Sequence, residues 1–171
     1  MVEVLIAIPA LAVGTLFPVF AERAAAGDRE GLAVFVHRAV VSSVVIGLAV
    51  AGALAIGGGL VIRIVAGPDF DAAAPVLRIQ GLALACSFIA APWAYALLAV
   101  GRERTLAVVN VVGVALALGV AAALIKAQGA RGAALATVLG EAGLATAFGV
   151  MLAREEVPLG LRQTPSRRGL R

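Results

Sequence analysis

The chain has 171 residues, of which 62% are apolar and 14% are charged, and its formal net charge is +4. Soluble domains have about 45–50% apolar and about 25% charged residues, and a domain this small needs a large polar surface relative to its volume. Such a hydrophobic composition excludes a water-soluble globule, and it also excludes intrinsic disorder. The composition therefore predicts an integral membrane protein.

Five apolar stretches are long enough to cross a hydrocarbon core of roughly 30 Å as helices of about 20 residues. None of them shows the alternation of apolar and polar residues that membrane β-barrel strands require. The first has acidic Glu3 and no basic residue ahead of it, which argues against a cleaved signal peptide. The sequence thus predicts an all-α polytopic membrane protein with about five transmembrane helices, at residues 4–21, 39–62, 79–101, 105–125 and 132–153.

Basic residues are distributed unequally between the predicted loops. Ten lie in the segment 22–38, in the turn 102–104 and in the tail after Ala153, whereas four lie in the other two connections. Because Lys and Arg resist translocation, the side with ten is expected to be cytoplasmic, which puts the N-terminus outside and the C-terminus inside. Residues 156–171 are predicted to be a disordered basic cytoplasmic tail that contacts anionic lipids. The positive charge lies between and after apolar runs, so a nucleic-acid partner is not predicted.

Two features of the spans bear on helix packing. Small residues recur every four positions, and such stripes allow close approach of helices in lipid, either as static packing or as a sliding interface. Pro92 interrupts the third span, which predicts a kink and makes this residue a candidate hinge, although a purely structural proline is an alternative. The stripes are Ser43, Gly47, Ala51, Ala55 and Gly59 in the second span, and Gly132, Ala136 and Gly140 in the fifth.

Glu141 is the single charged residue within the spans. A carboxylate at mid-span costs on the order of 2.5–3.5 kcal/mol on insertion scales, so this side chain should face protein or water. It is interpreted either as a proton or cation site in a polar cavity, or as a protonated carboxylic acid hydrogen-bonded to a neighbouring helix. Asn110 is the expected polar neighbour. Arg78 and Gln80, at the entry of the third span, are further candidates for a transport path, with interfacial snorkelling as the alternative for Arg78.

Sequence signatures of catalysis are missing. His37, expected in a loop, has no neighbouring ligand for a metal, and neither a phosphate-binding loop nor a nucleophile elbow occurs. Asp69 and Asp71 suit a turn that opens the next helix. Cys86 is interpreted as a small packing residue. No enzyme, cofactor or metal site is predicted.

Several segments, in order, resemble the C-terminal part of bacterial oligosaccharide flippases. These flippases form the polysaccharide-biosynthesis branch of the multidrug/oligosaccharidyl-lipid/polysaccharide exporter superfamily. The resemblance covers roughly residues 10–155 and rests on short motifs at helix ends. They are Leu16-Phe-Pro-Val-Phe20 with Asp28-Arg-Glu30, Val65-Ala-Gly-Pro-Asp-Phe-Asp-Ala-Ala73, Leu97-Leu-Ala-Val-Gly-Arg-Glu-Arg104 and Gln128-Gly-Ala-Arg-Gly-Ala-Ala-Leu-Ala136.

The resemblance implies a transporter of the bacterial inner membrane that moves a lipid-linked oligosaccharide across the bilayer for cell-surface polysaccharide biosynthesis. Members of the family have twelve to fourteen helices in two lobes, so about five spans correspond to most of one lobe. Rocking of two halves needs both of them, and a missing N-terminal lobe or a partner subunit is therefore expected. Two alternatives stay open: a multidrug or small-molecule exporter of the same superfamily, and a small accessory membrane protein that packs against other helices.

Overall fold

The computed structural model describes Gly14 and residues 17–154, and this part of the chain is helical without strands. Among the described residues, four helices are long and apolar enough to cross a membrane, and the predicted all-α polytopic membrane fold is thereby confirmed. A short helix precedes them, and a 3-10 turn joins the first two. The elements are α2 (Phe17–Ala25), α3 (Arg29–Val65), η1 (Pro68–Ala73), α4 (Ala74–Ala99), α5 (Glu103–Gln128) and α6 (Ala130–Arg154).

Two predicted segments fall wholly or mainly outside the described residues. Of the span 4–21, only Gly14 and residues 17–21 are described, and the latter begin α2. The basic tail 156–171 lies entirely outside them. The four remaining predicted spans overlap α3, α4, α5 and α6, and α3 begins ten residues before the predicted span 39–62.

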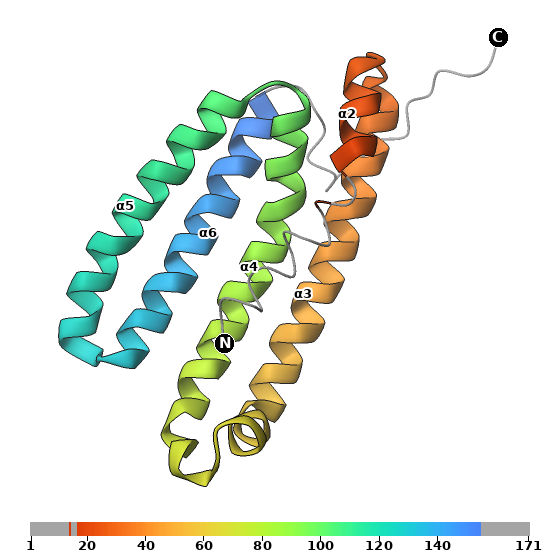
Figure 1. The fold of residues 1–171 in the computed structure, drawn as a ribbon. Coiled ribbons are helices and arrows are strands. Elements are labelled where there is room, and N and C mark those ends of the chain that lie inside the picture. Colours follow the sequence, from red (N-terminus) through yellow and green to blue (C-terminus); the bar gives the residue numbers. More distant parts are fainter. Residues whose placement is uncertain (1–13, 15–16, 155–171) are drawn as a thin grey trace.

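The four long helices lie side by side in the order α3, α4, α6, α5 (Figure 1). Helix α4 contacts α3 on one side and α6 on the other, and half of its most apolar window is buried. Helix α5 contacts mainly α6, and none of its apolar window is buried. The chain therefore forms a layer with α4 inside it and α5 at one edge.

Close backbone contact joins α3 to α4. A Cβ atom on Gly47 would lie 3.0 Å from Phe88 Cβ and 3.2 Å from Ala85 Cα, and one on Gly81 would lie 3.2 Å from Leu54 Cβ. Packing of this kind, rather than hydrophobic burial, drives helix association in lipid. The predicted small-residue stripe thus marks a real interface.

The row of small residues predicted on α3 lies in the contact with α4 for only part of its length. Ser43, Gly47 and Ala51 are buried, whereas Ala55 is exposed and Gly58, not Gly59, continues the buried row. A four-residue step advances about 400° around a helix with 3.6 residues per turn, so the stripe drifts about 40° per step and leaves the interface.

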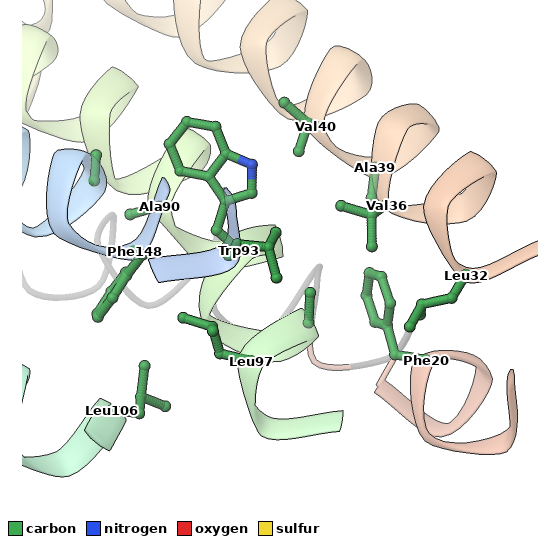
Figure 2. Close-up of a cluster of buried hydrophobic side chains, with 13 residues drawn as sticks. Phe20, Leu32, Val36, Ala39, Val40, Ala90, Trp93, Leu97, Leu106 and Phe148 are labelled. Carbon is green, nitrogen blue, oxygen red and sulfur yellow. The ribbon is translucent and has the colours of Figure 1, made fainter. Parts of the chain in front are cut away.

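A cluster of buried hydrophobic side chains lies toward the end of the layer that carries α2. Phe20 of α2 is fully buried against Leu32 and Val36 of α3, and Leu97 of α4 is buried in the same cluster (Figure 2). Phe148 of α6 extends the cluster across α4. Helix α2 is thereby anchored on the layer by an aromatic side chain.

Residues 22–38 were expected to form a loop, and this prediction is wrong. Helix α3 begins at Arg29, so His37 lies on a helix. The cause is a helix cap: Asp28 accepts a hydrogen bond from Gly31 N at 2.8 Å, which satisfies one of the free donors of the first turn. Arg23 reinforces this turn, since it lies 3.4 Å from the Asp28 carboxylate and over the Phe35 ring.

The turn predicted around Asp69 and Asp71 is confirmed as η1, but neither carboxylate caps α4. Asp71 instead accepts hydrogen bonds from Arg63, from Nε at 2.9 Å and from Nη2 at 2.7 Å. This bidentate geometry is the one favoured between a guanidinium and a carboxylate. It ties η1 to the end of α3.

The connections between α4 and α5 and between α5 and α6 are tight turns that contain glycines with positive φ angles. Gly101, with φ 77°, precedes α5, and Gly129, with φ 57°, is the single residue between α5 and α6. Successive long helices therefore run in opposite directions (Figure 1). The basic residues near their ends gather at the two ends of the layer. The end with α2 carries Arg23, Arg29, Arg38, Arg102, Arg104 and Arg154, and the other carries Arg63, Arg78, Lys126 and Arg131.

Replacement of Gly47 tests the α3–α4 contact. Gly47→Leu should lower the free energy of unfolding in detergent by about 1–3 kcal/mol, because the new side chain meets the Ala85 backbone. Gly52→Leu, on the same helix, should leave stability nearly unchanged, since a Cβ at Gly52 meets nothing within 4 Å. Thermal unfolding of both variants measures the difference. Equal melting temperatures would contradict the contact.

Candidate functional site

The only predicted mid-span charge, Glu141, lines a groove between α5 and α6. This groove has a volume of about 330 Å³. Thr137, one helical turn before Glu141, is its second polar lining residue, and the rest of the wall is apolar. Thr137 was not among the residues predicted for a site, although its four-residue spacing from Glu141 places both on one helix face.

Glu141 is half-buried and also faces α4. It lies one turn before Ala145 and two turns before Phe148, and both of these α6 residues are buried in one cluster with Trp93 of α4. Glu141 therefore lies where α4, α5 and α6 come together, and not on an outward, lipid-facing side. This agrees with the expectation that an intramembrane carboxylate faces protein or a cavity.

Several other polar side chains of the spans bond to their own helix. Asn110 Nδ2 donates to Leu106 O at 2.9 Å, Thr137 Oγ1 to Ala133 O at 3.1 Å, and Ser87 Oγ to Ala83 O at 3.2 Å. A carboxylate cannot do the same, because it is an acceptor and the backbone N–H groups within a helix are already used. Within the described residues, no group donates a hydrogen bond to Glu141.

Asn110 was expected to be the neighbour of Glu141, and the structure does not pair them. A Cβ on Gly113 would meet Leu144, and one on Gly140 would meet Ala117, which fixes the antiparallel register of α5 and α6. In this register Asn110 lies level with Ala147, six residues or about 9 Å along the helix from Glu141. Asn110 nevertheless continues the α5 stripe of Val114, Ala117 and Ala121 that lines the groove.

Arg78 and Gln80 lie nearer the opposite end of the layer from α2. Arg78 is exposed, and its Cγ would lie 3.4 Å from a Cβ on Gly58, so its stem runs along α3. This geometry fits interfacial snorkelling. Gln80 is half-buried, and its Oε1 is enclosed without a hydrogen-bond partner in the described structure.

Helices α4 and α6 run parallel, and a Cβ on Gly149 would touch the Trp93 ring at 3.1 Å. This contact puts Gln80 about level with Ala136, five residues or about 7.5 Å from Glu141. The predicted transport-path residues Glu141, Asn110, Arg78 and Gln80 therefore occupy different levels of the layer. They do not converge on one point.

Pro92 is buried within α4, and the helix continues through it from Ala74 to Ala99. It lies beside Trp93, whose indole Nε1 is also enclosed and without a hydrogen-bond partner in the described part of the chain. The hinge function of Pro92 stays a prediction.

Comparisons with known proteins give no relative: no family model matches the sequence, and neither a curated protein nor a solved structure matches it. The described residues also contain no group of three or more His, Cys, Asp or Glu side chains that could hold a metal ion. Glu141 and the groove that it lines form the candidate site.

The position of Glu141 against α4 can be tested with the single cysteine of the chain. In Glu141→Cys, mild oxidation should join the new thiol to Cys86, because the Gly149–Trp93 contact places Glu141 level with Ala85, next to Cys86, on the adjacent parallel helix α4. Counting of free thiols after denaturation should give two before oxidation and none after it.

Thr146→Cys is the matched control, because Thr146 is exposed and donates to its own helix at Ala142 O. It should keep both thiols under the same oxidation. Two free thiols retained in oxidised Glu141→Cys would contradict the placement of Glu141.

Proposed function

We propose that this chain forms the C-terminal part of a bacterial membrane transporter of the oligosaccharide-flippase type, which moves a lipid-linked oligosaccharide across the inner membrane. The observation that carries the proposal is the half-buried carboxylate of Glu141 in a groove between membrane helices, with no hydrogen-bond donor among the described residues. An intramembrane ionisable residue in a cavity is typical of substrate or ion pathways. The motifs at the helix ends supply the choice of family.

The exposed surface of α5 supports a second lobe or partner subunit. None of its apolar window is buried, so lipid or further helices must cover it. A transporter that works by rocking two halves needs such a counterpart, and the layer described here supplies one wall of the path. The same exposed surface suits the alternative of an accessory protein that packs against other helices. Export of drugs or other small molecules remains the alternative within the superfamily.

Replacement of Glu141 separates the transporter from the accessory protein. In the full-length protein expressed in the source cells, Glu141→Gln should reduce surface display of polysaccharide at least tenfold while protein abundance stays normal, because the substitution keeps size and removes charge. Thr146→Val, on another side of α6, is the control and should retain activity. Unchanged display in Glu141→Gln would reject a role of this carboxylate in oligosaccharide transport. Lost resistance to a toxic compound instead would favour the drug exporter.

Orientation is part of the proposal: the end with α2 and the Arg102–Arg104 turn faces the cytoplasm, because more Lys and Arg lie there. In a Cys86→Ser background, a cysteine at Gln128 should react with an impermeant maleimide added to intact cells. A cysteine at Glu103 should react only after the cells are opened. The reverse labelling pattern would show the opposite orientation.

A further inference from the structure

A second groove runs between α5 and α6, on a different side from the carboxylate of Glu141. It has a volume of about 360 Å³, and every one of its lining residues is apolar. Gly140 and Gly143 of α6 open it, and a Cβ on Gly143 would meet nothing within 4 Å. The lining on α5 extends from Val108 to Val120, which is about 18 Å at 1.5 Å per residue.

Two arginines stand at one end of this groove. On α5, Arg104 lies one turn before Val108, on the row that continues through Val112 and Leu116. On α6, Arg154 continues the row of Gly143 and Ala147. Both side chains are exposed, and neither forms an ion pair with a described residue.

The helix register brings these two arginines to the same height. Gly113 of α5 is level with Leu144 of α6, and Arg104 and Arg154 lie nine and ten residues beyond these positions toward the same end. The apolar groove fits an acyl chain, and the two arginines at its end fit a negatively charged phosphate. Together they match the two parts of an anionic lipid molecule.

We propose that the α5–α6 groove binds one anionic phospholipid, with an acyl chain along the Val108–Val120 wall and the phosphate held by Arg104 and Arg154. The length agrees with this occupant, because one leaflet contributes about 15 Å of the roughly 30 Å hydrocarbon core. The two arginines complement a negatively charged headgroup. A second copy of the chain or an uncharged lipid in the groove would make no use of this positive charge. This site does not depend on the proposed transport function.

Native mass spectrometry of the purified full-length chain tests the site, with phosphatidylglycerol and phosphatidylcholine of identical acyl chains as probes. The wild type should bind one phosphatidylglycerol at least tenfold more tightly than phosphatidylcholine. Arg104→Gln/Arg154→Gln should remove this preference. Lys126→Gln/Arg131→Gln removes the same charge from the other ends of α5 and α6, and it should keep the preference.

Obstruction of the groove tests the acyl-chain contact separately. Gly143→Leu should weaken binding of both lipids at least tenfold, whereas Gly52→Leu, at another open glycine, should not. Melting temperatures establish that the variants fold, and the arginine pair decides the proposal alone if Gly143→Leu does not fold. Equal losses in both double variants would overturn the site. Displacement of phosphatidylglycerol by inorganic phosphate would also overturn it. A dimer that excludes lipid and dissociates in Gly143→Leu would overturn it as well, because a second chain would then occupy the groove.

Discussion

Close contact between α4 and its two neighbours holds the layer together. In lipid, apolar side chains gain little by leaving their surroundings, so helices associate where backbones and side chains fit closely. On one side of α4, Gly47 faces Ala85 and Phe88, and on the other Gly149 faces the Trp93 ring. The other helices are placed by their contacts with these three, since α5 packs on α6, and α2 packs on both α3 and α4.

The same packing leaves α5 at the edge, with chemically different grooves on its two sides. Gly113, Ala117, Gly140 and Leu144 form a floor that both grooves share. On one side Thr137 and Glu141 add polar groups, and on the other the wall is apolar throughout. The edge helix is thus the part of the layer most open to a ligand or partner.

The sequence predicted the long helices well, because an uninterrupted apolar run of sufficient length allows little else in a membrane. It failed at the start of α3, where the cap at Asp28 extends the helix beyond the apolar run, so His37 is helical. It also could not place Asn110 or Gln80 relative to Glu141. Their separations depend on the register between helices, which Gly113, Gly140 and Gly149 set through contacts distant in sequence.

The rotation between neighbouring positions of α6 separates the two grooves. Gly143 lies two residues after Glu141, which is a turn of about 200° around the helix axis. A lipid chain at Gly143 and an ion or polar substrate at Glu141 would therefore occupy opposite sides of one helix without touching. Any influence of the lipid on the carboxylate must pass through α6 itself or its floor contacts with Gly113 and Ala117. The single-residue turn at Gly129 keeps these two helices in register, so a shift of α6 would move both grooves together.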